Sequence, residues 1–206
     1  MMSEPFFSII IPTHNGADRI SNAIDSCIQQ EFGDFELIII LDDCTDNTKS
    51  VVQSYATQDQ RITMLEVNYH RDGLTRNAGL DIATGQYILF LDDDDWWLHE
   101  FVLKQMRDML HQCESDILEY AIIWRHVGYT SSAPGRLKPM VAGHCWNRRF
   151  IGDTRFDDAS YSSDTHFLDE LRMKHPVGIT TALPMYYYNY MRPGSLSDRH
   201  ERGEIN

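Results

Sequence analysis

The sequence predicts an α/β fold in which a mostly parallel sheet is flanked by helices within a single domain. Short apolar runs alternate with amphipathic segments through the first half of the chain, which is the pattern of successive βα units. Three of these runs end directly in polar clusters, as strands do at the ligand-binding edge of a parallel sheet. The chain has 206 residues, of which 42% are hydrophobic, so it is long enough for one packed core and too short for two.

Four strands are expected in the first half, over residues 6–11, 37–41, 62–67 and 87–91. The helices between them are identified by apolar spacing: one carries Ile20, Ile24, Cys27 and Ile28, the next follows a cap at Thr45 or Asp46, and the third covers 73–83 with Leu74, Ala78 and Ile82 on its apolar side. Gly85 is the expected C-cap of that third helix. A fourth helix is expected over 98–110.

The second half is less regular. Residues 117–124 predict a buried strand, and residues 131–139 predict a loop because they contain two prolines and a glycine. A short helix is expected after Asp164, followed by a tyrosine-rich edge strand over 185–191. From Ser195 onward the chain is polar enough to fray.

The composition excludes several classes of function. A formal charge of −13 argues against nucleic acid or an anionic membrane as a partner, and it implies that an anionic substrate needs a bridging cation. The cysteines (Cys27, Cys44, Cys113 and Cys145) form no CxxC pair, which favours reduced thiols in a cytoplasmic protein over a zinc or redox site. The sequence shows no transmembrane segment, so any membrane contact is expected to be peripheral.

Acidic residues follow two of the apolar runs, and they are the strongest candidates for chemistry. Asp92, Asp93, Asp94 and Asp95 come directly after the run that ends at Leu91. Such a cluster can simply favour the positive end of a helix, but neighbouring carboxylates also repel one another unless a cation separates them. Hard carboxylate oxygens suit Mg²⁺ or Mn²⁺, which commonly bridge a protein to substrate phosphates. We therefore expect a metal role here.

Other candidates are ambiguous from residue type alone. An Asp at 42 or 43 caps a following helix in many proteins, yet it can also accept hydrogen bonds from a nucleobase or a ribose. Arg76 is either a solvated charge or a bidentate ligand of a diphosphate. Trp96 and Trp97 are more often core residues than a stacking surface for a sugar.

Taken together, the motifs resemble the family-2 glycosyltransferases with the GT-A fold, a Rossmann-like α/β architecture. The resemblance is carried by FSIIIPTHNG ending at Gly16, by FELIIILDDCTDNT over 35–48 and by GLTRNAGLDIATGQYILFLDDDDWW over 73–97, in the order and spacing of the family. It is fainter in SSDTHFLDEL over 162–171 and MYYYNYMRPGSLS over 185–197. It implies one catalytic domain over 1–206, with a nucleotide-sugar-binding half (1–110), an acceptor-side half (111–194) and a polar tail (195–206).

The resemblance also assigns roles to residues. Asp92 and Asp94 match the acids of the D-x-D motif and are the implied metal ligands. The residues implied to hold the nucleotide sugar are Pro12, Thr13, His14, Asp43, Gly73, Arg76, Asn77 and Asp93, with Asp93 placed for a ribose contact. Asp164 occupies the place of the catalytic base, although Ser163 replaces the Glu that commonly precedes it. Asp157, Asp158 and Asp169 are alternative bases.

The implied function is metal-dependent, inverting transfer of a sugar, of the hexosyl or N-acetylhexosaminyl class, from a nucleotide-diphosphate sugar (UDP-linked in the first instance) to an acceptor hydroxyl. The acceptor is an unidentified glycan, lipid-linked molecule or protein. Alternatives are a homologue that binds nucleotide sugars with little turnover, and a metal-dependent phosphohydrolase. Trp96 and the mid-chain position of the acidic run disfavour the phosphohydrolase, and a missing glycine-rich loop disfavours a nucleotidylyltransferase.

Overall fold

The structure, a computed structural model, describes residues 4–113, 115–125, 128–130, 140–159 and 163–189, together with 192, 193, 195, 198, 199, 202 and 203. The predicted loop over 131–139 and the end of the predicted strand over 185–191 lie outside the described residues. The elements of the first half are β1 (Phe7–Thr13), α1 (Ile20–Ile28), β2 (Phe35–Asp42), α2 (Thr48–Ala56), β3 (Ile62–Val67), α3 (Asp72–Ile82), β4 (Tyr87–Phe90), β5 (Trp96–Trp97) and α4 (Val102–Gln112). Those of the second half are β6 (Ile117–Trp124), β7 (Gly128–Thr130), a 3₁₀ turn η1 (Val141–Gly143), β8 (His144–Asn147), α5 (Arg148–Ile151), α6 (Ser163–Met173) and β9 (Gly178–Tyr188).

Within the described residues the strands form one nine-stranded sheet in the order β3-β2-β1-β4-β8-β6-β9-β5, with β7 beside β6. The strands β3, β2, β1 and β4 run parallel, whereas β8 lies antiparallel between β4 and β6. The predicted α/β fold, with a mostly parallel sheet flanked by helices, is confirmed. Because β1, β2 and β4 are parallel and adjacent, the residues after them meet at one edge of the sheet.

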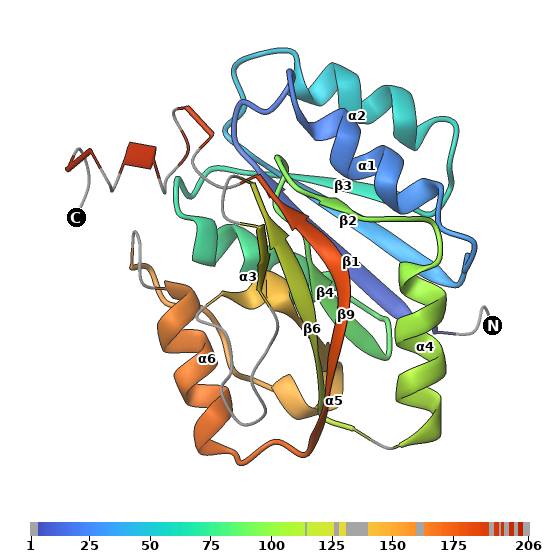
Figure 1. The fold of residues 1–206 in the computed structure, drawn as a ribbon. Helices are drawn as coiled ribbons and strands as arrows, with labels where there is room; N and C mark the ends of the chain where they lie inside the picture. Colours follow the sequence, from blue (N-terminus) through green and yellow to red (C-terminus); the bar gives the residue numbers. More distant parts are fainter. Residues whose placement is uncertain are drawn as a thin grey trace.

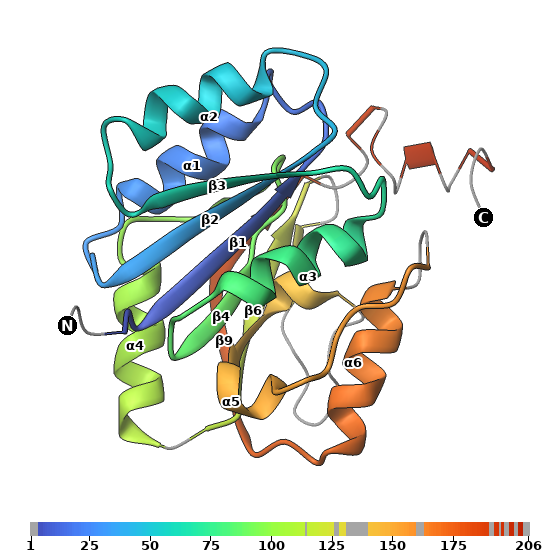
Figure 2. The same ribbon diagram turned by 180° about the vertical axis from the view of Figure 1, so that it is seen from behind.

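Helices cover both faces of the sheet, with α1, α2 and α4 on one side and α3, α5 and α6 on the other (Figures 1 and 2). Successive residues of β1 face opposite sides: Ile9 and Ile11 pack in the core with α1 and α4, and Ile10 packs in the core with α3 and α6. A strand that is buried on both faces must be apolar throughout, which explains the continuous runs in the sequence. None of the described helices has the length and apolar character needed to cross a membrane.

The predicted apolar face of α3 is correct at Ala78, which is buried in the core, but wrong at Leu74 and Ile82. Ile82 is 39% exposed and Leu74 is only partly buried, whereas Gly79 and Leu80 face the core. A Cβ at Gly79 would lie 2.5 Å from Cγ2 of Ile10, so the helix approaches the sheet more closely than any side chain at this position would permit. Close backbone packing, rather than the largest side chains, selects the buried face.

Gly85 is not the C-cap of α3; that position belongs to Ala83, which has an extended conformation. A Cβ at Gly85 would lie 2.6 Å from the backbone nitrogen of Ser8. The lack of a side chain at Gly85 therefore allows the backbone to approach β1 closely. Before α2, the predicted cap at Asp46 is observed in part. Its carboxylate accepts a hydrogen bond from the backbone N–H of Thr48 at 2.9 Å, although Asn47 occupies the N-cap position.

Two boundaries also differ from the prediction. The helix expected over 98–110 begins at Val102, because Trp96 and Trp97 form β5 and the N–H of Leu98 bonds to the carbonyl of Met185. The tyrosine-rich strand β9 begins at Gly178 and is not an edge strand along its tyrosine-rich half, since it pairs there with both β6 and β5. This pairing brings the end of β9 beside the acidic run after β4.

Candidate functional site

A cavity of about 420 Å³ opens at the carboxyl edge of β1, β2 and β4. Seven of the residues predicted for the site line it: Pro12, Thr13, His14, Arg76, Asp92, Asp93 and Asp94. The other lining residues come from the same loops and from the end of the chain: Arg19, Asp42, His70, Arg71, Asp72, Tyr188, Asn189, Arg192, Ser195 and Arg199. The fold therefore gathers most of the predicted residues into one polar cavity.

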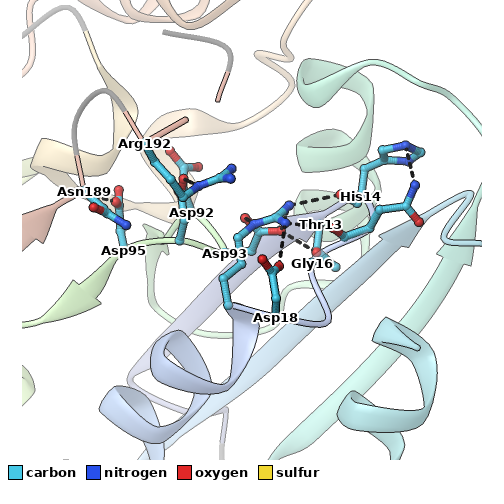
Figure 3. Close-up of polar contacts among 12 residues, drawn as sticks. Thr13, His14, Gly16, Asp18, Asp92, Asp93, Asp95, Asn189 and Arg192 are labelled. Atoms are coloured by element: carbon cyan, nitrogen blue, oxygen red, sulfur yellow. Dashed lines mark hydrogen bonds and ion pairs between the residues drawn. The ribbon is translucent and has the colours of Figure 1, made fainter. Parts of the chain in front are cut away.

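Three carboxylates of the acidic run each face a different arginine. Arg76 Nη2 lies 2.7 Å from Asp92 Oδ1, Arg19 Nε lies 2.8 Å from Asp93 Oδ1, and Arg192 Nε lies 2.7 Å from Asp94 Oδ2. Successive side chains of the run point in different directions, so Asp93 lies beside Thr13 and Gly16 while Asp92 lies toward Arg192 (Figure 3). The guanidinium groups of these three arginines thus offset the repulsion between the neighbouring carboxylates.

Asp95 is fully buried, and none of the described arginines pairs with it. It accepts hydrogen bonds from the hydroxyl of Tyr186 at 2.5 Å and from the N–H of Asn189 at 2.8 Å. Burial, together with the charges of Asp94 and Asp92, raises the pKa of Asp95 well above its ordinary value. Asp95 ties the end of β9 to the acidic run and faces away from the cavity lining.

Asp94 and Asp92 offer two carboxylates to the cavity. Burial raises the pKa of Asp94, opposed by its hydrogen bond from Arg192 and reinforced by the charge of Asp92. The described residues contain no group of three or more His, Cys, Asp or Glu side chains arranged around a common point. Two hard carboxylates that line the cavity nevertheless fit Mg²⁺ or Mn²⁺, because these ions commonly take one or two protein carboxylates and complete their shell with phosphate oxygens and water.

Arg76 connects the acidic run to the predicted base. Its side chain is only 7% exposed, and Nη1 lies 3.7 Å from Asp164 Oδ1 while Nη2 bonds to Asp92. Burial opposes its charge, but Asp164, Asp92 and Asp72 outweigh that effect and raise the pKa of Arg76, which therefore stays protonated. One guanidinium thus holds the candidate base beside a candidate metal ligand.

Asp164 lies in the first turn of α6 and accepts a hydrogen bond from the N–H of Val141 at 3.2 Å. Burial raises the pKa of its carboxyl, whereas the charge of Arg76 lowers it, and the net shift is upward. A carboxylate with a raised pKa is a better proton acceptor than an ordinary aspartate. The arrangement is chemically suited to a general base.

The alternative bases lie elsewhere. The carboxylate of Asp157 contacts His166, which holds the pKa of Asp157 below its ordinary value. Asp169 pairs with Arg172 at 2.5 Å on the exposed side of α6, and Asp158 is exposed. None of these three lines the cavity formed by the described residues, and neither does Asp164, which is linked to the cavity through Arg76.

At the end of β2, Asp42 and Asp43 have different surroundings. The Asp42 carboxylate accepts hydrogen bonds from the N–H groups of Tyr69, His70 and Arg71, at 2.7, 3.1 and 3.3 Å, and from the hydroxyl of Thr75 at 2.8 Å. Burial alone would raise the pKa of Asp42, but these hydrogen bonds outweigh it and lower the pKa. Asp42 therefore holds the loop between β3 and α3.

Asp43, the residue predicted to contact the nucleotide, is partly exposed and lies 3.3 Å from His70 Nε2. It has a positive φ of 45°, as do Asn15 at 50° and His70 at 52°, so three left-handed residues surround this end of the cavity. His14 Nδ1 donates to the carbonyl of Asp42 at 2.6 Å, and its Nε2 accepts from Asn15 at 3.1 Å. These two hydrogen bonds fix the orientation of the His14 imidazole at the cavity wall.

Gly73 and Asn77 do not line the cavity. A Cβ at Gly73 would lie 2.6 Å from the carbonyl oxygen of Asp157, and the Asn77 amide both donates to the carbonyl of Phe156 and accepts from its N–H, at 2.8 and 2.9 Å. Both residues join α3 to the segment before α6. Their observed contacts are with protein backbone.

The sequence interpretation identified Arg76 but missed the other four arginines of the cavity. Five arginines line the cavity alongside five aspartates, although the whole chain carries a net charge of −13. The cavity thus offers guanidinium groups to an anionic substrate in addition to any bridging cation. Arg19 and Arg192 lie far from the acidic run in sequence, and no spacing rule joins them to it; the RPGS turn after the tyrosine-rich strand was the available signal for Arg192.

The sequence model for "Glycosyl transferase family 2" matches residues 8–124. The match covers more than half of the chain and includes β1, β2, α3, β4 and the whole acidic run. The chain belongs to glycosyl transferase family 2. A relative from Campylobacter jejuni, named GalNAc(5)-diNAcBac-PP-undecaprenol beta-1,3-glucosyltransferase, is 43% identical over 93 residues, which is 44% of this chain and 30% of the relative.

Solved structures show that the likeness in fold extends to the second half of the chain. TarS of S. aureus (residues 1–349, in complex with UDP-GlcNAc) superposes with a TM-score of 0.83 at 20% identity, covering 93% of this chain and 60% of that one. The mannosyltransferase PcManGT of Pyrobaculum calidifontis, in complex with GDP-Man and Mn²⁺, gives a TM-score of 0.77 at 18% identity, covering 98% and 62%. The GT-A fold is thereby confirmed. The chain spans less than half the length of the first curated relatives that it matches.

Proposed function

We propose that this chain transfers a sugar from a nucleotide-diphosphate sugar, a UDP-sugar in the first instance, to a hydroxyl of an acceptor. One observation carries the proposal: the cavity at the carboxyl edge of β1, β2 and β4 holds the acidic run, and Arg76 links that run to Asp164. A donor needs a site for its diphosphate, and the attacking hydroxyl needs a base. The guanidinium of Arg76 contacts both the acidic run, where the diphosphate is proposed to bind, and Asp164, the proposed base.

The nucleotide is proposed to bind against the first loop. Pro12, Thr13, His70 and the oriented ring of His14 line this end of the cavity, and Asp43, which is not a lining residue, contacts His70. The cavity volume of about 420 Å³ falls within the range for small-molecule sites. The UDP-GlcNAc complex of TarS supports a uridine nucleotide, and the GDP-Man complex of PcManGT makes guanosine the alternative to test.

Asp92 and Asp94 are the proposed ligands of Mg²⁺ or Mn²⁺. Such an ion would stabilise the negative charge that develops on the diphosphate as it leaves. The arginines of the cavity share this task through their own charge, because Arg192 and Arg76 lie beside the same carboxylates. The Mn²⁺ in the PcManGT structure supports the assignment.

Asp164 is the proposed general base. In an inverting single displacement, the acceptor oxygen forms a bond to the anomeric carbon as the bond to the diphosphate breaks, and the hydroxyl proton passes to the carboxylate of Asp164. The raised pKa of Asp164 and its place beside Arg76 support this role over Asp157, Asp158 and Asp169. General-base assistance of this kind is typically worth about 10²–10⁴-fold in rate.

The acceptor is proposed to be a glycan or a lipid-linked saccharide. The name of the Campylobacter jejuni relative, which contains a diphospho-undecaprenol, supports a lipid-linked molecule. A cytoplasmic, peripherally membrane-associated site of action would suit such an acceptor. The proposed hexosyl or N-acetylhexosaminyl class of the donor is supported by the glucosyltransferase name of this relative and by the UDP-GlcNAc bound by TarS.

Titration calorimetry with UDP, GDP and dTDP tests the donor site. In Mn²⁺, UDP is expected to bind more tightly than the other two nucleotides, and excess EDTA is expected to weaken binding at least about tenfold, since the ion links carboxylates to phosphates. Equal affinity with and without EDTA would overturn the metal assignment. No binding by any of the three would overturn the donor site itself.

A further inference from the structure

Arg19 occupies an unusual position beside the cavity, because its guanidinium joins two loops that are far apart in sequence. It lies at the N-cap of α1, and its side chain is 18% exposed. Nε donates to Asp93 Oδ1 at 2.8 Å, and Nη2 donates to Asp93 Oδ2 at 2.9 Å. The pair is bidentate, which is the geometry that fixes a carboxylate most firmly.

The remaining donors of Arg19 bind the first loop. Nη1 donates to the carbonyl of Asn15 at 2.7 Å and to Asp18 Oδ1 at 3.2 Å, and Nη2 donates to the carbonyl of His14 at 3.1 Å. A guanidinium has five N–H groups, and five hydrogen bonds are formed. Arg19 is therefore fully engaged by protein acceptors, and it would have to release one of them to bind a phosphate.

Asp93 is enclosed from the other side as well. The hydroxyl of Thr13 donates to Asp93 Oδ2 at 2.5 Å, and a Cβ at Gly16 would lie 2.5 Å from the same oxygen. Figure 3 shows Asp93 beside Thr13 and Gly16. Burial raises the pKa of Asp93 to about 6, with Arg19 and Thr13 acting in the opposite direction. Both carboxylate oxygens have protein partners, which favours a structural contact over the expected ribose contact.

We propose that Arg19 is a positioning residue of the donor site, which sets the nucleotide loop His14–Gly16 at a fixed distance from the proposed metal ligands Asp92 and Asp94 through its pair with Asp93. This inference rests on the proposed function. A nucleotide diphosphate must contact the first loop with its base and the acidic run with its phosphates. Fixing the two loops before binding lowers the cost of ordering them when the donor arrives.

A comparison of single and double variants separates positioning from simple stabilisation. Arg19→Gln leaves Asp93 buried without a cation, which destabilises the fold, whereas Arg19→Gln combined with Asp93→Asn removes that charge. Arg19→Lys keeps the charge but has fewer, differently placed donors. Arg61→Gln is the matched control, because Arg61 makes the same bidentate pair with Asp59, at 3.0 and 2.6 Å, outside the cavity.

The first readout is affinity for UDP in Mn²⁺, measured well below the melting temperature of each variant. Arg19→Gln is expected to bind UDP about 10-fold to 100-fold more weakly, as misplaced binding groups generally do. The double variant is expected to recover melting temperature but not affinity, because the carbonyls of His14 and Asn15 still lack their donor. Arg19→Lys should be intermediate, and Arg61→Gln should bind as the wild type does. Recovery of full affinity in the double variant would overturn the proposal.

The second readout does not depend on the proposed function. Amide hydrogen exchange in the ligand-free protein reports local opening of the two loops. Residues 13–18 and 92–95 are expected to exchange faster in both Arg19→Gln and the double variant, and at the wild-type rate in Arg61→Gln. Unchanged exchange in the two loops would overturn the positioning role even in a protein that binds no nucleotide. Faster exchange combined with no UDP binding by the wild type would retain Arg19 as the link between the loops and reject the donor site.

Discussion

The ends of β2 and β4 look alike in sequence, since each is an apolar strand that ends in Leu-Asp-Asp, but they hold their carboxylates in different ways. Asp42, after β2, is bound by three backbone N–H groups and one hydroxyl. Asp92 and Asp94, after β4, are bound by the side chains of Arg76 and Arg192. Backbone donors cannot leave without unfolding a loop, whereas an arginine side chain can rotate away.

This difference separates a structural acid from acids that are able to exchange partners. A carboxylate saturated by backbone amides stabilises the loop that supplies them, and its pKa is lowered, as at Asp42. A carboxylate that faces an arginine can give up that partner to a cation or a phosphate with little change elsewhere. The comparison therefore predicts that substitutions of the aspartates after β4 mainly impair function, whereas substitution of Asp42 at the end of β2 mainly lowers stability.

The largest expected effect is at Asp164, which shares Arg76 with Asp92. Asp164→Asn should lower turnover about 10²–10⁴-fold while leaving donor affinity within about threefold, because Asn matches the shape of Asp but cannot take the proton. Steady-state transfer assays combined with calorimetry provide the measurement. Activity within a few-fold of the wild type would pass the role to Asp157, Asp158 or Asp169, and an equal loss of donor affinity would make Asp164 a binding residue.

The next largest effect is at Asp94. Asp94→Ala should weaken Mn²⁺-dependent nucleotide binding about 100-fold, the value of a lost charged ligand, and should change the free energy of unfolding by less than about 1 kcal/mol. Stability should hold because losing a repelling carboxylate offsets losing the pair with Arg192. Calorimetry and urea denaturation measure the two quantities. A variant that unfolds would show that Asp94 is as structural as Asp42.

The comparison predicts the reverse pattern after β2. Asp42→Asn should lower the free energy of unfolding by about 2–3 kcal/mol, because one amide oxygen cannot accept all four hydrogen bonds and the amide NH₂ faces backbone N–H groups. Asp43→Asn is the matched control one residue away, partly exposed, and should cost less than about 0.5 kcal/mol. Urea denaturation checks both values. Equal losses in the free energy of unfolding would show that Asp42 is no more structural than Asp43.

A smaller effect is expected in acid. Because the folded-state pKa of Asp42 is lowered, its contribution to stability is complete above the unfolded-state pKa of about 3.9 and is lost as the pH falls through the folded-state pKa. The difference in stability between the wild type and Asp42→Asn should therefore narrow below about pH 4. Denaturation curves at a series of pH values test this, and a difference that stays constant into acid would contradict the lowered pKa.

The first half of the molecule was largely predictable because its strands are buried on both faces and their ends fall at one edge. The runs that became β1, β2 and β4 thus located the cavity, and the acidic run was found from its position after β4 alone. Short elements of the second half, such as β8 (His144–Asn147), carry too few residues for a period to be visible. The prediction of the buried face of α3 was wrong at two positions because the helix backbone packs closely against β1 at Gly79. The hydrophobicity of the side chains does not encode this contact.

The site was predictable only where it is contiguous in sequence. Asp92 to Asp94 could be found because they are neighbours, whereas Arg19 and Arg192 are brought to them by tertiary structure. Gly73 and Asn77 show the opposite case, since they lie within a recognisable motif yet contact the backbone of residues 156 and 157. A motif locates a region of the fold, and the side-chain partners decide what each residue in it does.

The most direct test of donor use by the acidic cavity is release of UDP from UDP-GlcNAc and UDP-glucose, measured in Mn²⁺ and again in excess EDTA. The wild type should release UDP from at least one of the two donors, by transfer or by slow hydrolysis, and Asp94→Ala should release it no faster than the EDTA control. The variant Arg61→Gln, which keeps the acidic run intact and changes a residue outside the cavity, should retain release in Mn²⁺. Release that is equally fast in EDTA and in Asp94→Ala, or no release from either donor under any condition, would contradict the account.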